Sequence, residues 1–322
     1  MTDEPAGRTL TLHVTHKQQI ADDIYQFEFR DASGAELPEF TPGSHITVTV
    51  PSGQKRRYSL CNSASERDRY VIAVKREASG RGGSLSFTTD VQEGDAVEVE
   101  APANEFMMSS GEPKSYIFIA GGIGITPVRA MIMHLIGQGK SNFHLYYFTR
   151  SPTMMAFREE FSGEAFAGKV TLHHDEGNPE LAFDLWPVLE EQRGAHVYCC
   201  GPRGLMDAVR DMTGHWPDSA VHFEDFAGAS ATRADDTAFV VKLAKSGETV
   251  EVPAGTTILD ALRRHGRTMP SSCESGTCGT CRTAYTSGEP DHRDLVLSER
   301  EKRSEIMICV SRAKSPELTL DI

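Results

Sequence analysis

Apolar and polar residues alternate in short runs along the first third of the chain. Each run covers only a few residues, and Gly, Pro, Asn and Asp stand between the runs. Several short alternating segments at this spacing are typical of antiparallel sheets in which each strand buries one face. The pattern predicts a small antiparallel β-barrel or sandwich with strands at 10–15, 24–29, 45–50, 57–61, 70–75 and 96–100.

The pattern changes beyond residue 114, where apolar runs alternate with segments of helical periodicity. Alternating strands and helices favour a doubly wound parallel sheet, which binds ligands beyond the carboxyl ends of its strands. The predicted strands cover 115–120, 144–149, 170–174, 196–200 and 221–224, and the predicted helices cover 127–137, 157–161, 184–192 and 204–215.

The last part of the chain returns to short strands. Residues 227–237 are small and polar without periodicity, which predicts a linker. After it we expect a hairpin at 238–252, a helix at 257–265 that ends at Gly266, and strands at 306–310 and 317–320. The predicted organisation is a barrel domain at 1–110, an α/β domain at 111–228, a linker at 229–236 and a β-rich domain at 237–322.

Composition narrows the classes of function. The chain has 322 residues, enough for two or three domains. Its formal net charge of −13 argues against nucleic acid as a partner, because nucleic-acid binding needs a basic face. There is no apolar run of about 20 residues, so we expect no membrane span. The acidic N-terminus lacks the apolar core of a secretion signal, and we expect a cytoplasmic protein.

Four of the seven cysteines carry the strongest chemical signal. Cys273, Cys278 and Cys281 have the spacing C-x4-C-x2-C, and Cys309 follows alone. This is the ligand pattern of plant-type [2Fe–2S] clusters. A structural zinc site usually shows two close pairs of Cys or His instead, and three cysteines with interleaved glycines make poor core material. The sequence therefore predicts an iron–sulfur cluster held by these four thiolates.

Two segments inside the predicted barrel have the character of a nucleotide site. The segment RRYSL at 56–60 places cations beside Tyr58, whose flat face can stack on a ring. The segment GRGGS at 80–84 enters a predicted helix, and the free N–H groups of such a turn bind anions. Ser84 adds a hydroxyl, and either Arg56 or Arg81 would supply a charge-assisted contact to a phosphate. Either segment alone is compatible with an ordinary loop or strand edge, but their pairing favours a nucleotide site.

Two further turns follow strands of the predicted parallel sheet. The segment GGIGITP at 121–127 lets the backbone approach a pyrophosphate, and we expect Thr126 as N-cap and Pro127 as first helical residue. Pro127 replaces the third glycine of the usual dinucleotide motif, so this turn alone is a weak signal. The second turn is Cys200-Gly201-Pro202, next to Cys199, which we expect to be a buried strand residue. Both turns follow strands of the predicted sheet, at the edge where such sheets bind ligands.

The succession RRYSL, GRGGS, GGIGITP, YCCGP, HFEDF and the cysteine pattern resembles the family of phthalate dioxygenase reductases over essentially the whole chain. These are single-chain reductases of two-component Rieske oxygenases, with a C-terminal ferredoxin domain and usually FMN. The related benzoate-type reductases put the ferredoxin domain first and usually carry FAD, so the domain order here speaks against them. The resemblance implies an antiparallel flavin-binding β-barrel, a doubly wound parallel-sheet NAD domain and a plant-type ferredoxin (β-grasp) domain.

The resemblance also implies a role for each matching residue. In the flavin site Tyr58 stacks on the isoalloxazine, and Ser59, Cys200 and Phe226 lie at the reacting rings. Asp175 is implied to accept hydrogen bonds from the adenine ribose, which favours NADH over NADPH. The residues implied to bind FMN are Arg56, Tyr58, Ser59, Leu60, Val74, Lys75, Gly82, Gly83, Ser84 and Phe226. The residues implied to bind NADH are Gly121, Gly122, Gly124, Thr126, Pro127, Asp175, Cys200, Gly201 and Pro202.

The implied activity is electron transfer from NADH to FMN, then to the [2Fe–2S] cluster and to a separate Rieske oxygenase that attacks an aromatic ring. The cofactors would carry this chemistry, and the protein would position and tune them. Two alternatives stay open: a reductase for a related O-demethylase or chlorobenzoate dioxygenase, and a non-enzymatic iron–sulfur redox sensor. We expect a monomer. Arg57 stands where the flavin motif usually has a small residue, and the sequence leaves its orientation open.

Overall fold

The computed structural model describes residues 9–78, 82–226, 233, 235–271, 276, 279–294, 296–298 and 300–322. The chain forms two compact units, Met1–Glu224 and Asp225–Ile322. The first unit holds both the predicted barrel and the predicted α/β domain, so the domain limits at 110, 228 and 236 stay predictions. Within the described part, no helix is long and apolar enough to cross a membrane.

The barrel is a single antiparallel sheet of six strands, as the alternating pattern predicts. Its strand order is β4-β3-β6-β1-β2-β5, and a bridge between Leu60 and Ile72 joins the segment after β4 to β5 and closes the sheet. Buried aromatic residues such as Phe27, Phe29 and Phe87 fill the interior. The elements are β1 (Thr9–Ala21), β2 (Ile24–Arg30), β3 (Ser44–Thr49), β4 (Lys55–Ser59), β5 (Tyr70–Lys75), α1 (Gly83–Asp90) and β6 (Ala96–Asn104).

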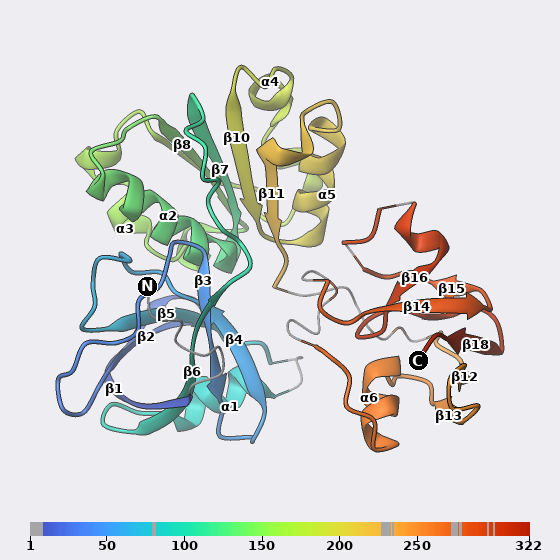
Figure 1. Ribbon diagram of the computed structural model, residues 1–322. Helices are drawn as coiled ribbons and strands as arrows, with labels where there is room; N and C mark the ends of the chain where they lie inside the picture. The colour runs from blue at the N-terminus through green and yellow to red at the C-terminus, as the bar shows by residue number, and fades with distance from the viewer. Residues whose placement is uncertain are drawn as a thin grey trace. The chain divides into compact units, whose positions relative to one another are not determined.

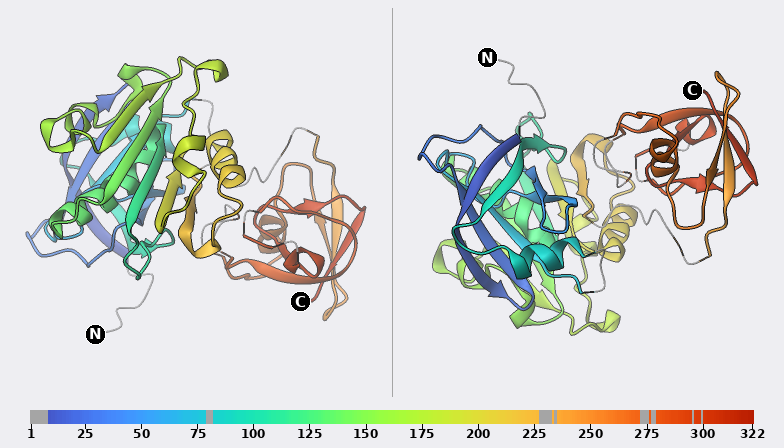
Figure 2. Two further views of the ribbon diagram at one scale, coloured as in Figure 1. Left: turned by 90° about the horizontal axis from the view of Figure 1, so that it is seen from above. Right: turned by 90° about the horizontal axis from the view of Figure 1, so that it is seen from below.

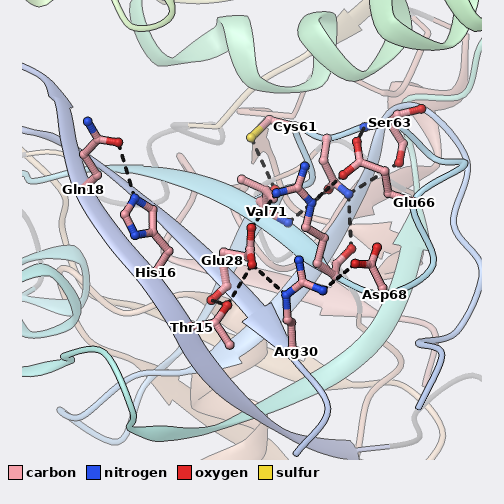
Figure 3. A network of polar contacts seen from close by, with 12 residues as sticks. Thr15, His16, Gln18, Glu28, Arg30, Cys61, Ser63, Glu66, Asp68 and Val71 are labelled. Atoms are coloured by element: carbon pink, nitrogen blue, oxygen red, sulfur yellow. Dashed lines mark hydrogen bonds and ion pairs between the residues drawn. The ribbon is translucent and has the colours of Figure 1, made fainter. Parts of the chain in front are cut away.

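A network of ion pairs ties β1, β2 and the segment before β5 together on the barrel surface (Figure 3). Glu28 Oε1 accepts hydrogen bonds from Arg30 Nε at 2.8 Å and Thr15 Oγ1 at 2.9 Å, and Glu28 Oε2 accepts from Arg69 Nη1 at 2.6 Å. Burial raises the pKa of Glu28, but these hydrogen bonds outweigh burial and lower that pKa to about 2. Glu28 therefore stays ionised over the whole neutral range.

The second half of the first unit is a doubly wound parallel sheet, which confirms the predicted fold class. The strand order is β11-β10-β7-β8-β9, and every neighbouring pair is parallel. Helices α2 and α3 cover one face and α4 and α5 the other, as Figures 1 and 2 show. The strands are β7 (Ser115–Gly121), β8 (Phe143–Thr149), β9 (Val170–His174), β10 (Ala195–Cys200) and β11 (Val221–Glu224). The helices are α2 (Ile125–Gly137), α3 (Arg158–Phe161), α4 (Trp186–Leu189) and α5 (Arg203–Met212).

Helix α4 is only one turn long, whereas the periodicity predicts a helix over 184–192. Only Leu185 and Leu189 are fully buried in this stretch, so the sheet stabilises a single turn. Short 3₁₀ helices complete this part of the chain at η1 (Gly122–Gly124), η2 (Pro152–Met154), η3 (Glu164–Phe166), η4 (Pro179–Leu181) and η5 (Asp218–Ala220).

The described part of the second unit contains a mixed five-stranded sheet, the helix α6 and a small sheet of β15 and β17. The strand order is β13-β12-β18-β14-β16, with β12 and β18 parallel. Thr257 caps α6 by accepting a hydrogen bond from the Asp260 N–H at 3.0 Å, and the helix ends before Gly266, as predicted. The elements are β12 (Phe239–Leu243), β13 (Thr249–Val252), α6 (Ile258–Arg264), β14 (Arg282–Ser287), β15 (Pro290–Asp291), η6 (Glu301–Arg303), β16 (Glu305–Met307), β17 (Arg312–Ala313) and β18 (Glu317–Leu320).

Replacing Glu28 with Gln tests the network of Figure 3. The folded pKa of Glu28 is depressed, so its stabilising effect is present above pH 4.5, its ordinary pKa, and is lost as the pH falls toward about 2. We expect Glu28→Gln to lower the free energy of unfolding at pH 7 by about 1–3 kcal/mol and to flatten its decline in acid. Urea unfolding of the full chain across pH measures this effect. Glu39→Gln, which removes an exposed partner of Arg67, is the control and should change little.

Candidate functional site

Strand β4 presents two different faces because successive side chains alternate across a strand. Tyr58 lies on one face, where its ring stacks on Phe87 of α1 with ring centroids 5.7 Å apart. The Tyr58 hydroxyl is buried, and no described residue is its hydrogen-bond partner. Burial raises the pKa of Tyr58, so the phenol stays neutral. A buried hydroxyl without a partner is costly, which suits a ligand with a polar atom at this place.

Arg56 shares this face of β4 and lies against the start of α1. A Cβ atom on Gly83 would be 2.5 Å from Arg56 Nε, so only glycine lets the guanidinium approach the helix so closely. Gly82 is the N-cap with a left-handed φ of 82°, and the first turn of α1 contains no acidic residue. Ser84 Oγ accepts a hydrogen bond from the Glu77 N–H at 3.1 Å. Free helix N–H groups and a cation at one point form a cradle for a phosphate.

Three other residues of the predicted flavin site are buried in the core or paired with another side chain. Leu60 and Val74 are fully buried in the barrel core, so only their backbones are available to a ligand. Lys75 forms an ion pair with Glu77 at 2.7 Å. Gly80 and Arg81 of the predicted loop lie outside the described residues.

The two predicted dinucleotide turns meet at one point of the parallel sheet. Strands β8 and β9 lie on one side of β7, and β10 and β11 lie on the other. The order of the strands therefore reverses between β7 and β10, which is where doubly wound sheets bind ligands. A Cβ on Gly124 would be 2.2 Å from the Cys200 carbonyl oxygen, and a Cβ on Gly121 would be 2.5 Å from Pro202 Cδ. Glycines let the two turns touch and leave their backbones open to a pyrophosphate.

The start of α2 differs from the prediction. Thr126 is not the N-cap: η1 runs from Gly122 to Gly124, Gly124 caps α2, and Thr126 is its second residue. Thr126 Oγ1 donates to the Ile123 carbonyl at 3.0 Å instead of accepting from a free N–H. Pro127 is consequently the third helical residue. Helical geometry begins earlier because Gly122 adopts a left-handed φ of 55°, which the sequence pattern does not reveal.

Asp175 and Phe226 lie at other places. Asp175 directly follows β9, an edge strand, and its carboxylate accepts a hydrogen bond from the Gly177 N–H at 2.9 Å. This position at the carboxyl edge of the sheet is compatible with a ribose contact. Phe226 is 44% exposed and belongs to the second compact unit, so its place beside a flavin stays a prediction.

Glu224 is a functional candidate that the sequence analysis missed. Ser59 Oγ of β4 lies 3.5 Å from Glu224 Oε2 at the end of β11, and Glu224 is in register with Cys200 on β10. The pKa of Glu224 is raised to about 8, above all by burial; the hydrogen bond to Ser59 lowers this pKa, Glu105 raises it and Arg57 lowers it. The segment HFEDF, which contains Glu224, supported the family resemblance, but sequence analysis assigned Glu224 itself no role. Its place at the carboxyl end of a strand of the parallel sheet was the signal that could have identified it.

Cys281 and Cys309 are buried in the apolar core of the second unit. Cys281 precedes Arg282, which pairs with Met307 across β14 and β16, and Cys309 follows Met307 by two positions. The register therefore brings both cysteines to the same end of this strand pair. Gly276 and Gly279 adopt left-handed φ values of 76° and 82°, which suit a tightly turning ligand loop. Cys273 and Cys278 lie outside the described residues.

The other predicted cysteine is structural. Cys199 points to the opposite face of β10 from Cys200 and is packed between α4 and α5. Burial raises the pKa of the Cys199 thiol to about 12.

Comparison with known families agrees with this division of the chain. Residues 11–108 match the family "Oxidoreductase FAD-binding domain", residues 118–211 match "Oxidoreductase NAD-binding domain", and residues 241–314 match "2Fe-2S iron-sulfur cluster binding domain". These matches confirm an oxidoreductase with flavin, NAD and [2Fe–2S] domains in the predicted order. The alternative of a non-enzymatic redox sensor is therefore set aside.

Individual relatives are similar over the full chain. "Phthalate dioxygenase reductase" from Burkholderia cepacia is 52% identical over 323 residues, which cover 100% of both proteins. "Phthalate 4,5-dioxygenase oxygenase reductase subunit" from Pseudomonas putida is 50% identical over 97% of this chain and 96% of the relative. A solved phthalate dioxygenase reductase, titled a modular structure for electron transfer from pyridine nucleotides to [2Fe-2S], has 53% identity and a TM-score of 0.81 over 98% of each chain.

The protonation of Glu224 predicts a dependence of stability on pH. Because folding raises this pKa from 4.5 to about 8, the stabilising effect is present below pH 4.5 and is lost as the pH rises through about 8. The unfolding free energy of the unchanged protein should fall between neutral and alkaline pH as Glu224 ionises. In Glu224→Gln, whose side chain stays neutral, we expect this fall to be smaller by about 1–2 kcal/mol. Urea unfolding at a series of pH values measures this, with the exposed Glu112→Gln as control. Equal pH profiles for Glu224→Gln and the unchanged protein would contradict a raised pKa.

Proposed function

The chain belongs to the family of phthalate dioxygenase reductases, and on that premise we propose that it carries electrons from NADH through FMN and a [2Fe–2S] cluster to a Rieske oxygenase acting on an aromatic ring. One observation carries this proposal. The phosphate cradle at α1 and the dinucleotide turns at β7 and β10 belong to one compact unit, and the contact between Ser59 and Glu224 joins them. A flavin strand and a nucleotide site that meet in this way are suited to exchange electrons.

A bound flavin would supply the link between NADH, a two-electron donor, and a [2Fe–2S] cluster, a one-electron acceptor. The residues of this chain would bind and orient the cofactors. Arg56 and the first N–H groups of α1 would hold the FMN phosphate, and Tyr58 would stack on the ring. Arg56 lies against the first turn of α1, a position that suits a terminal phosphate, which supports FMN over FAD.

NADH would bind at the turns that contain Gly124 and Cys200. Its nicotinamide end would then face Ser59 and Glu224. Asp175, a carboxylate, would accept from ribose hydroxyls and repel a 2′-phosphate, which supports NADH over NADPH. For the cluster we propose Cys273, Cys278, Cys281 and Cys309 as ligands. A monomer in a reducing cytoplasm suits such a cluster and a separate acceptor protein.

An anaerobic NADH titration followed by visible absorbance and low-temperature EPR tests the relay. We expect flavin bleaching together with the rhombic signal of a reduced [2Fe–2S] cluster. Bleaching without this signal would leave a flavin reductase and overturn the oxygenase-reductase proposal. Reconstitution with phthalate dioxygenase, an O-demethylase or a chlorobenzoate dioxygenase then identifies the partner by NADH consumption coupled to product.

Replacing Cys309 with Ser separates the cluster from the flavin. We expect the variant to lose the EPR signal and more than about 90% of electron transfer to an oxygenase, while NADH–ferricyanide activity survives through the flavin. Cys199→Ser is the matched control, because Cys199 is equally buried but lies outside the ligand pattern. If Cys309→Ser kept its transfer to the oxygenase, Cys309 would not be a ligand.

Replacing Arg56 with Gln tests the phosphate cradle. Because a charge-assisted hydrogen bond to phosphate contributes about 1.5–3 kcal/mol, FMN affinity should fall by about 10–100-fold. Riboflavin, which has no phosphate, should bind equally well to both proteins. Fluorescence titration of the flavin-free chain measures both affinities, and Lys55→Gln on the same strand is the control. An equal loss for FMN and riboflavin would place Arg56 away from the phosphate.

A further inference from the structure

Arg57, the cation that departs from the usual flavin motif, points away from the phosphate cradle. Lys55, Arg57 and Ser59 share one face of β4 because side chains alternate along a strand. Arg57 Nη1 lies 2.9 Å from Glu105 Oε2, and Arg57 Nη2 lies 3.3 Å from Glu105 Oε1. Two parallel contacts of this kind match the fork of a guanidinium to a carboxylate. The side chains are 28% and 29% exposed, so water screens the pair only in part.

Glu105 is held in place by its neighbours on both sides. Asn104, the last residue of β6, donates through Nδ2 to Thr41 Oγ1 at 2.6 Å and accepts through Oδ1 from the Phe106 N–H at 2.9 Å. Phe106 is buried in the cluster that contains Tyr198 of the parallel sheet. The backbone at Glu105 is therefore anchored on both sides, and the pair lies on the same face of β4 as Ser59.

The pair lies close to Glu224, because Arg57 is two residues from Ser59 on the same face of β4 and Ser59 Oγ lies 3.5 Å from Glu224 Oε2. The two charges of the pair therefore act on Glu224 with opposite signs. Burial of Glu224 is the largest cause of its raised pKa. In addition, the Ser59 hydrogen bond lowers this pKa, Glu105 raises it and Arg57 lowers it. The titratable neighbours of Glu224 along the chain are His222, which is uncharged at neutral pH, and the buried carboxyl of Asp225. Cys200, in register on β10, is a buried thiol, and the pKa of His222, two residues earlier on β11, is lowered to about 4, chiefly by burial.

We propose that the Arg57–Glu105 ion pair is a positioning device that sets the charge of Glu224 beside Ser59. A neutral Glu224 carries a proton and can donate a hydrogen bond, whereas an ionised Glu224 only accepts and adds a negative charge at this place. Arg57 favours the ionised form and Glu105 the neutral form, so their contact balances the two. This proposal rests on the proposed function, because the charge of Glu224 matters for electron transfer only if a flavin binds beside Ser59. In it, Arg57 is a positioning residue that acts through Glu224.

The test is an infrared pH titration of the full-length protein as purified. Glu224→Gln identifies the carbonyl band of the protonated Glu224 carboxyl by its loss. We expect Arg57→Gln to raise the titration midpoint by about half to one pH unit and Glu105→Gln to lower it by a similar amount. The double variant Arg57→Gln/Glu105→Gln should return close to the midpoint of the unchanged protein, because both charges are removed.

Lys55→Gln is the matched control. Lys55 lies on the same face of β4 and pairs with Glu100 at 2.5 Å, but this pair is further along the strand from Ser59. It should leave the midpoint unchanged. Shifts of Arg57→Gln and Glu105→Gln in the same direction, or no shift in either, would overturn the proposal, since a purely structural role gives no opposite signs. If Arg57→Gln did not fold, Glu105→Gln alone would decide, because its midpoint must fall.

The titration also keeps this proposal separate from the proposed function. It reports the Glu224 carboxyl directly and needs neither NADH turnover nor an oxygenase. If the protein did not transfer electrons from NADH but the midpoints of Arg57→Gln and Glu105→Gln still shifted in opposite directions, only the proposed function would be overturned. In the holoprotein, the pH at which FMN affinity changes should follow the same order of midpoints in the three variants.

Discussion

The close approach of two glycine turns at the carboxyl ends of β7 and β10 is the constraint on which the rest of the site depends. Any side chain at Gly124 would collide with the Cys200 carbonyl and separate the turns. The ladder between β10 and β11 places Glu224 beside Cys200. Ser59 Oγ of the barrel lies 3.5 Å from Glu224 Oε2, so the ends of β4 and β11 meet. The contact of the two turns and this contact with β4 together shape the proposed dinucleotide and flavin sites.

A second set of contacts fixes the barrel against the parallel sheet within the same unit. Arg129 of α2 donates to the carbonyl of Cys61, just beyond β4, and pairs with Glu160 of α3 at 2.7 Å. Ile24 and Ala73 of the barrel belong to the apolar cluster of the sheet. These contacts leave the flavin strand little freedom relative to the nucleotide turns, which is what electron transfer between two bound cofactors requires.

Two carboxyl groups of this unit show how surroundings assign charge. Glu28 is partly buried, yet Arg30, Arg69 and Thr15 keep it ionised. Among the described residues, Ser59 and Arg57 favour the ionised form of Glu224, but burial together with Glu105 prevails and raises its pKa to about 8. The first carboxylate ties strands of the barrel together, and the second lies at the carboxyl end of β11 with a raised pKa. Residue type alone distinguishes neither case, because each depends on which cations the fold brings near.

The sequence by itself determined the fold class, the strands of the first unit, the glycine turns and the spacing of the cysteines, because these depend on local periodicity and on residues close together in the chain. It missed β14, β15 and β17 of the second unit. Tertiary structure decided what depends on distant partners. The orientation of Arg57 rests on Glu105, and the importance of Glu224 rests on Ser59, far away in sequence. The start of α2 at Ile125 and the single turn of α4 were likewise set by backbone geometry and burial, which no pattern of residue types encodes.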